Sequence, residues 1–482
     1  MKKIILSTLS ILFIFISCDT SLDINRDPDS ISDAPMSSQL PSGMLGLVAA
    51  EGSYYALVGG FWSQYWTQSP GSNQYKDIDG YVIGSGDLFG AWVAMYDALG
   101  DIRNVKRKAL AEQNWNYYLM STVLEVQGSQ LLTDFYGDIP YSQANDKAFL
   151  DPKYDKSQSI YDQMVIDLDN ALTKDLSTSK GSIPAADDLI FAGNMSKWKS
   201  FANTLKLKIY MRQTNSSRAA IASTGINALI TSGVSFLNVD AGLAQFTDSP
   251  NLSNPLYESD RRQLNTGTNL KMSRTMESFF NVNIDTRKAK YYGTGLFVYQ
   301  GDFEQNLPQN TFATVIVNPT TPAFLMSKEE SLFLQAEAQA RYGTAAAAKT
   351  FYDSAVSTNF TRYTLTSATY TSAGGVYEFP LGGTLNDQIK AIITQKWVAG
   401  FPGNGFEAFF DTNRTGFPKK SLVVQSNAAY VPGELAYSVN GVTSAGKFPR
   451  RIVYPQEEST TNSNAPSVGT YIITTPIWWD QN

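Results

Sequence analysis

Apolar residues recur at helical spacing along much of the chain. The clearest stripe lies in residues 157–172, where Ile160, Tyr161, Met164, Val165, Leu168, Ala171 and Leu172 share one face. Such a stripe predicts a helix with one buried side. The same spacing predicts helices over residues 43–66, 87–113, 116–133, 194–212, 217–231, 345–358 and 386–399, with shorter ones at 275–280 and 407–413. Ser327 and Glu330 have the spacing of a capping box, which predicts one more helix that Gly343 ends.

These helices come in consecutive pairs, at about residues 41–113, 114–176, 194–232 and 327–359. A single pair cannot cover its own apolar face, so such pairs stack on one another. We therefore predict an all-α fold with one domain over residues 41–482 and few short strands. Residues 233–326 and 415–482 are rich in Asn, Ser, Gly, Thr and Pro, and these stretches predict long irregular loops.

The first residues have the order of an export signal. Two lysines precede an apolar run from Ile4 to Ile16, and the small residue Ser17 then precedes Cys18. A basic start, a short apolar run and a small residue before the cut are typical of a signal peptide, here residues 1–17. The run is too short for a transmembrane helix, which needs about 20 apolar residues.

A signal that ends at a small residue followed by Cys resembles the signal of bacterial lipoproteins. The resemblance implies that Cys18 carries the lipid and that residues 18–40 form a tether and a docking segment. Phe15 departs from the aliphatic residue that is commoner at its position, and the alternative is an ordinary signal peptide with a chance Cys. Because Cys18 is the one Cys of the chain, the lipoprotein signal is favoured. Several acyl chains on one residue would give a stable membrane anchor.

Composition argues against several classes of function. The chain of 482 residues has a net charge of -6 and no run of Lys and Arg, which argues against binding to nucleic acid. It contains no His, so Ser-His-Asp and Cys-His nucleophile systems and His-based metal sites are excluded. We expect no catalytic residues, no cofactor and no resident metal. Two alternatives stay open: an irregular calcium site with oxygen ligands, and a glycosidase that uses a pair of carboxylates.

Aromatic residues make up 12% of the chain and gather in loops. Flat rings stack on the C–H faces of sugars and lose little rotamer entropy when they bind, so loop aromatics and their polar neighbours are the candidate ligand contacts. These candidates are Trp66, Asn73, Tyr75 and Tyr81 between the first two helices, and Tyr257, Arg261, Arg262 and Tyr292 in the irregular middle. We expect Trp66 and Tyr75 to be exposed beside a turn, Trp62 to lie in the core and Trp478–Trp479 to dock the tail. Loop packing by Tyr rings and solvated Arg is the alternative for the second group.

Several segments resemble those of the SusD-like outer-membrane lipoproteins of Bacteroidetes. In family order they are residues 133–141 (TDFYGDIPY), 198–207 (WKSFANTLKL), 254–257 (NPLY), 393–397 (ITQKW) with 405–409 (GFEAF), and 448–455 (FPRRIVYP). The resemblance implies four tetratricopeptide-like helix pairs that scaffold the loops. It also implies a lipid-anchored protein of the cell surface that binds oligosaccharide nutrients, without chemistry, for a SusC-like TonB-dependent β-barrel transporter. A peptide-binding receptor of the RagB type is the alternative within the same family.

Overall fold

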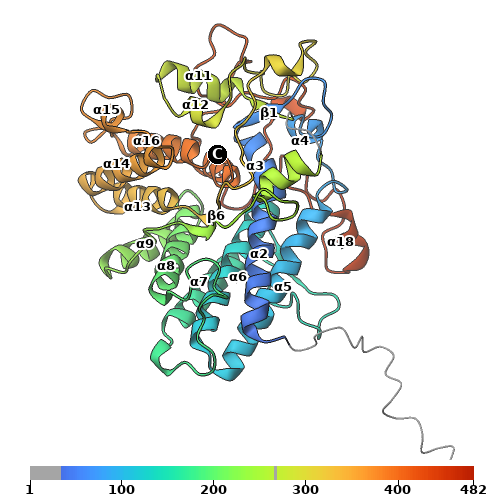
Figure 1. Ribbon diagram of the computed structural model, residues 1–482, viewed down its shortest axis with the longest axis vertical. Coiled ribbons are helices and arrows are strands. Elements are labelled where there is room, and N and C mark those ends of the chain that lie inside the picture. The colour runs from blue at the N-terminus through green and yellow to red at the C-terminus, as the bar shows by residue number, and fades with distance from the viewer. Residues whose placement is uncertain (1–33, 265–268, 482) are drawn as a thin grey trace, which may run out of the picture.

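The computed structural model describes residues 34–264 and 269–481 (Figure 1). Cys18, the signal and most of the predicted tether lie outside the described residues. Helices dominate the described part, and the all-α prediction is confirmed. The longer helices are α2 (Met36–Ala50), α5 (Phe89–Glu112), α6 (Trp115–Tyr136), α7 (Ser157–Leu172), α8 (Met195–Arg212), α9 (Ala219–Thr231), α13 (Lys328–Tyr342), α14 (Ala345–Arg362), α16 (Leu385–Ala399) and α17 (Gly405–Thr415).

Short helices and two-stranded antiparallel sheets complete the described part. The short helices are α3 (Ala56–Trp62), α4 (Lys76–Asp79), α10 (Pro255–Tyr257), α11 (Arg274–Val282), α12 (Lys288–Tyr291), α15 (Ala368–Thr371) and α18 (Gln456–Thr461), with π-helical turns at Glu51–Tyr55 and Glu258–Arg262 and 3-10 turns at Leu176–Thr178, Gln309–Thr311 and Ser444–Gly446. The strand pairs are β1 (Trp66–Gln68) with β5 (Leu270–Met272), β2 (Ile139–Pro140) with β3 (Tyr154–Asp155), and β4 (Ala241–Leu243) with β6 (Ala323–Met326). None of the described helices is both long enough and apolar enough to cross a bilayer.

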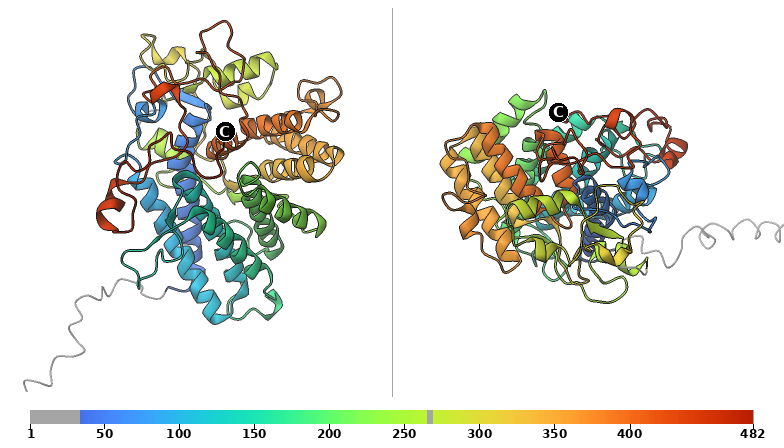
Figure 2. Two further views of the ribbon diagram at one scale, coloured as in Figure 1. Left: turned by 180° about the vertical axis from the view of Figure 1, so that it is seen from behind. Right: turned by 90° about the horizontal axis from the view of Figure 1, so that it is seen from above.

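The four predicted helix pairs are in contact: α2 with α5, α6 with α7, α8 with α9 and α13 with α14. Helices α2, α5 and α6 run lengthwise through one half of the molecule, whereas α13, α14 and α16 stack to one side (Figures 1 and 2). Helix α6 is buried along almost its whole length, because apolar side chains surround it. The likeness of these pairs to tetratricopeptide repeats stays a prediction.

Helix α2 begins at Met36, before the start near Gly43 that the periodicity suggests. Serines and Pro41 interrupt the apolar pattern in its first turns, although Leu40 is fully buried. Gly43 allows α5 to come close, since a Cβ on Gly43 would lie 2.6 Å from Cγ1 of Ile102. The helix therefore extends into the segment that the sequence assigns to docking.

An aromatic core joins the early and late parts of the chain. The Trp62 ring is buried, as predicted, with its centroid 5.0 Å from that of Phe409 in α17. The C-terminal tail returns to this core, where Trp479 is fully buried against Phe410 at 5.8 Å between ring centroids. The guanidinium of Arg212 lies 5.4 Å from the centroid of the Trp479 ring. The predicted docking of the C-terminal tail is thus confirmed.

Candidate functional site

Trp66, expected to be exposed, is fully buried, and that prediction is wrong. The loop after α3 continues directly into β1, where Trp66 pairs with Met272 of β5. The indole packs edge-on against Phe61 and Phe401, and it occupies the space that a side chain on Gly60 would need. Its faces are therefore closed to a ligand in this structure.

The neighbouring loop residues divide between core and surface. Tyr75 is buried, contrary to expectation, and its backbone N–H donates to Oε1 of Gln68 at 2.8 Å. Tyr81 is buried with its ring edge against Tyr437, at 5.5 Å between centroids. Asn73 is exposed at the turn. Of these loop candidates, Asn73 is the one whose side chain faces solvent.

The candidates of the irregular middle take up packing roles. The Arg262 guanidinium lies 5.4 Å from the centroid of the Tyr257 ring and forms an ion pair with Asp248. Arg261 donates from Nη2 to the carbonyl oxygen of Val315 at 2.9 Å. All three side chains of Tyr257, Arg261 and Arg262 are half-buried. These contacts agree with the alternative interpretation, in which the residues pack the loop. They differ from it in one respect, because both Arg side chains have protein partners instead of facing solvent.

Two of the predicted candidates are brought together by a buried carboxylate. Asp260 pairs with Nη1 of Arg261 at 2.8 Å and hydrogen-bonds with Tyr75. Tyr292 is elsewhere, buried, and donates from its hydroxyl to the carbonyl oxygen of Tyr65 at 2.6 Å. The predicted residues therefore do not form one ligand surface.

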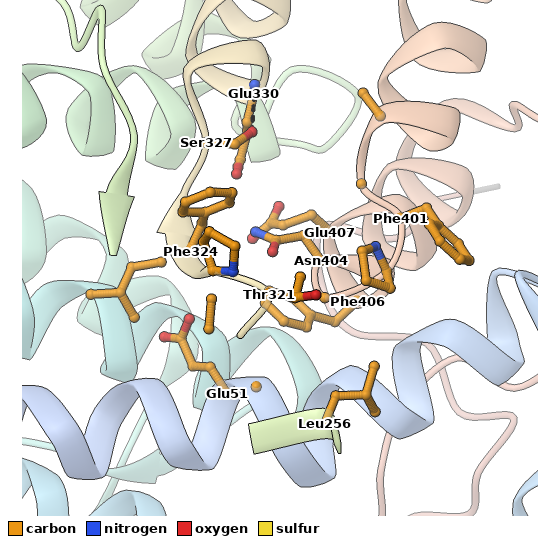
Figure 3. A pocket seen from close by; sticks show the side chains of 18 of the residues that line it. Glu51, Leu256, Thr321, Phe324, Ser327, Glu330, Phe401, Asn404, Phe406 and Glu407 are labelled. Atoms are coloured by element: carbon orange, nitrogen blue, oxygen red, sulfur yellow. Dashed lines mark hydrogen bonds between the residues drawn. The ribbon is translucent and has the colours of Figure 1, made fainter. Parts of the chain in front are cut away.

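A cavity of about 310 Å³ lies where the N-terminal helices meet the late part of the chain (Figure 3). Its walls come from the end of α2 and the π-helical turn after it, from the loop before β6, and from the starts of α13 and α17. The lining residues fall within the stretches 48–52, 254–256, 321–333, 362–363 and 396–408, without filling them. Cavities of this size and mixed lining are typical of small-molecule sites, so we take it as the candidate site.

Aromatic rings form one part of the wall. Phe401 and Phe406 are buried behind it, whereas Phe324 and Tyr363 are half-exposed at its edge. In Figure 3 the rings of Phe324 and Phe401 lie on opposite sides of the cavity. The half-exposed rings can offer a face to a ligand.

Two asparagines give the cavity its polar part. Asn254 donates from Nδ2 to the carbonyl oxygen of Thr321 at 2.8 Å, and its Oδ1 accepts the backbone N–H groups of Leu256 and Tyr257. It thereby fixes the loop that closes the cavity. Nδ2 of Asn404 is buried at the cavity and has no hydrogen-bond partner among the described residues. That amide is free to donate to a ligand.

Two acids at the cavity bind their protons more tightly than usual. Both carboxyl oxygens of Glu51 accept from Nε2 of Gln127, at 3.1 and 3.2 Å. Burial raises the pKa of Glu51 from 4.5 to about 8, so it carries a proton at neutral pH. Burial also raises the pKa of Glu330, and neither of its carboxyl oxygens accepts a hydrogen bond from the described residues.

The third acid, Glu407, is held in its ionised form. Burial acts to raise its pKa, but Lys208 and Arg212 outweigh burial and lower the pKa to about 2. Nζ of Lys208 lies 2.8 Å from Oε1 of Glu407, and Nη2 of Arg212 lies 2.6 Å from Oε2. Behind the cavity, ion pairs continue from Asp411 to Lys396 at 2.8 Å and to Arg414 at 2.7 Å. This buried network ties α8, α16 and α17 together.

Sequence reasoning missed these residues, although two signals pointed toward them. The first signal is Glu51, an ionisable residue within a mainly apolar stretch, whereas the spacing of Glu330 from Ser327 predicts a capping residue alone. Ser327 does cap α13 by accepting the N–H of Glu330, at 3.1 Å, but the Glu330 carboxyl does not accept the N–H of Ser327, so half of the predicted capping box forms. The segments that resemble a known family include Asn254 and Glu407, which line the cavity. Among the residues the structure describes, no three thiols or carboxylates come together in a metal-binding arrangement.

Comparison with known families gives a match over most of the chain. The model of the SusD-like family, described as starch-binding and associating with the outer membrane, matches residues 28–455. Comparison with the curated proteins gives no significant match.

Solved structures share the fold at low sequence identity. A chitin-binding SusD homologue from Flavobacterium johnsoniae is 23% identical, with a TM-score of 0.71 over 92% of this chain and 99% of that one. A SusD homologue from Bacteroides uniformis is 24% identical, with a TM-score of 0.67 over 92% and 99%. A SusD/RagB family protein from Bacteroides thetaiotaomicron is 20% identical, with a TM-score of 0.74 over 93% and 99%. Since the family model covers more than half of the sequence, this chain belongs to the SusD-like family.

Proposed function

We propose that this protein binds oligosaccharides at the outer-membrane surface and delivers them to a TonB-dependent β-barrel transporter. The family description, starch-binding and associating with the outer membrane, supports the ligand class and the location. The chitin-binding relative supports a glycan ligand. A lipid on Cys18 would hold the protein at the membrane.

The cavity beside α17 is the proposed glycan site. A sugar ring has apolar C–H faces and an edge of hydroxyl groups, so it needs flat rings and hydrogen-bonding groups together. Phe324 and Tyr363 offer half-exposed rings, and Nδ2 of Asn404 is a donor without a partner. This unpartnered amide in a ring-lined cavity is the observation that carries the proposal.

We further propose that the protein binds without chemistry. Glycoside hydrolysis requires one protonated carboxyl and one free carboxylate on opposite sides of the bond. Glu330 binds its proton more readily than usual, but the oxygens of Glu407 are engaged by Lys208 and Arg212. A turnover assay on starch and chitin oligosaccharides is expected to show no product, and product that disappears in Glu330→Gln would favour the glycosidase instead.

Calorimetry tests the glycan site directly. The full chain, purified in detergent, is titrated with starch, cellulose and chitin oligosaccharides and with a peptide pool. Phe324→Ala removes a stacking face and should weaken glycan binding by about tenfold, which is ~1.4 kcal/mol. Phe149→Ala is the matched control, because this exposed ring lies outside the cavity lining. Unchanged glycan affinity in Phe324→Ala would show that glycans bind outside this cavity. If peptides bind and glycans do not, the result would support the peptide receptor instead.

Membrane attachment and delivery need separate measurements. Cys18→Ala should move the protein from the membrane fraction to the soluble fraction, because no acyl chain can then be added. Its retention in membranes of cells that lack the transporter would contradict the lipid anchor. Co-purification of the lipidated protein with a β-barrel transporter is the expected result for delivery, and its absence would leave a surface binding protein without that partner.

A further inference from the structure

One end of the cavity holds a carboxylate without a donor. Glu330 is 5% exposed, and neither Oε1 nor Oε2 accepts a hydrogen bond from the described residues. Among the residues that the structure describes, the cation in contact with it is Nζ of Lys208, 3.5 Å from Oε1, and that ammonium lies closer to Glu407, at 2.8 Å. A buried carboxylate with unused lone pairs is costly unless a ligand supplies the donors.

The other cations at the cavity are already paired with other carboxylates. Arg362 donates to Asp240 at 2.7 Å and also pairs with Glu329. Lys396 is engaged with Asp411 at 2.8 Å. Both basic residues of the lining are therefore occupied by carboxylates that lie outside it.

Carboxyl groups also outnumber cations in the buried network behind the cavity. Among the described residues, six acids face five bases: Glu51, Asp134, Glu330, Glu337, Glu407 and Asp411 against Lys208, Arg212, Arg341, Lys396 and Arg414. The proton that Glu51 keeps at neutral pH balances this excess. Of these five bases, Lys208 is the one that contacts Glu330, and it lies closer to Glu407.

We infer that the cavity binds a sugar unit that carries a protonated amine, with its ammonium group at Glu330. This inference rests on the proposed function and names its substrate class, the amino sugars. An ammonium has three N–H donors and no acceptor, which complements two carboxylate oxygens that accept nothing. Nδ2 of Asn404 donates to a hydroxyl oxygen of the same sugar, across the cavity (Figure 3).

A neutral sugar at a protonated Glu330 is the competing arrangement. In that case the carboxyl group donates to a sugar hydroxyl, and an ammonium group on the ligand brings no advantage. The two arrangements therefore differ in which substituent of the sugar they favour.

Three β-1,4-linked hexamers separate these arrangements. They are the hexamers of glucosamine, glucose and N-acetylglucosamine, which differ at one ring carbon that carries an amine, a hydroxyl or an acetamide. They are titrated calorimetrically into the full chain at a series of pH values from mildly acidic to neutral, because low pH protonates the amines whereas the raised pKa of Glu330 makes its carboxylate commoner at higher pH. The glucosamine hexamer should bind at least about tenfold more tightly than the other two, since hydrogen bonds to charged groups are stronger than those between neutral groups.

Variants locate the preference within the protein. Glu330→Gln should abolish the preference for the glucosamine hexamer, whereas Glu112→Gln, which alters an exposed acid at the end of α5, should retain it. Asn404→Ala should lower the affinity for all three hexamers by the same factor. This variant also serves as a control, because it tests whether the protein still folds and binds when a cavity residue is replaced. Thermal unfolding checks each variant.

The outcomes are distinct. Equal affinity for the three hexamers overturns the inference and leaves glycan binding intact. A preference that survives in Glu330→Gln also overturns it, because the negative charge of the whole protein would then be the cause. If none of the hexamers and none of the starch oligosaccharides binds, the proposed function fails as well.

Discussion

Gly59 of α3 lies directly against Gly405, the first residue of α17. A Cβ on Gly59 would lie 2.1 Å from the backbone nitrogen of Phe406 and 2.6 Å from the carbonyl carbon of Gly405. The helices therefore touch backbone to backbone, and this contact places Phe406 and Glu407 at the cavity.

Gly59→Ala should destabilise the protein, because the new methyl group meets backbone that cannot rotate away. Overpacking of this kind costs about 1–3 kcal/mol. The free energy of unfolding in urea measures the loss. Gly86→Ala is the control, since a Cβ there meets nothing within 4 Å and its stability should be unchanged or slightly higher. Equal stability of the two variants would contradict the close contact.

Arg287→Met should destabilise the fold by about 3–5 kcal/mol, the usual consequence of leaving a buried carboxylate without its partner. Arg287 and Asp285 have fully buried side chains 2.7 Å apart, and Arg287 also donates to Asn359 at 2.8 Å. Urea unfolding provides the measurement. Lys153→Met, which removes an exposed partner of Asp155, should cost at most about 1 kcal/mol. A loss at Arg287 as small as at Lys153 would contradict the prediction.

Glu51 should make stability fall as pH rises. Its pKa is about 8 in the folded protein and 4.5 when unperturbed. Between these two values the unfolded chain binds fewer protons than the folded one, so stability is lost as the pH increases from 4.5 toward 8. Each unit of pKa difference corresponds to about 1.4 kcal/mol. Glu51→Gln should not lose stability over this pH range. The free energy of unfolding is measured against pH for both proteins, and parallel curves would contradict the role of Glu51.

Asn254→Ala should affect both stability and ligand binding. Asn254 caps α10 and holds the carbonyl of Thr321 at the cavity edge. Loss of a cap costs about 0.5–2 kcal/mol, and the freed loop should lower glycan affinity. Asp175→Ala removes the Asp175 cap of the 3-10 turn at residues 176–178, away from the cavity, and should leave affinity unchanged. Equal glycan affinity in the two variants would show that the loop held by Asn254 does not contribute to glycan binding.

Local periodicity predicted the helices well, because each buried face repeats within its own segment. Helix α7 begins and ends where the stripe of residues 157–172 does. Periodicity did not predict the first turns of α2, because Pro41 and several serines interrupt the apolar pattern there.

The site residues were predicted poorly, because their environments depend on segments distant in sequence. Turn signals suggested exposure for Trp66, but β5 and Phe401 cover it. Glu51, Glu330 and Asn404 share a cavity although they come from three separate stretches. Spacing along the chain does not indicate which distant segments come together in the fold. The resemblance to a known family did point to two segments of the cavity wall, residues 254–257 and 405–409.

The position of Trp479 has a consequence for biogenesis. It is synthesised after every helix that it packs against, and it covers Phe410 and the guanidinium of Arg212. Until the last residues arrive, an apolar ring and part of the charged network remain open to water. The scaffold thus reaches its final packing only after Trp479 has been synthesised, so a nascent chain that lacks this residue stays easier to unfold.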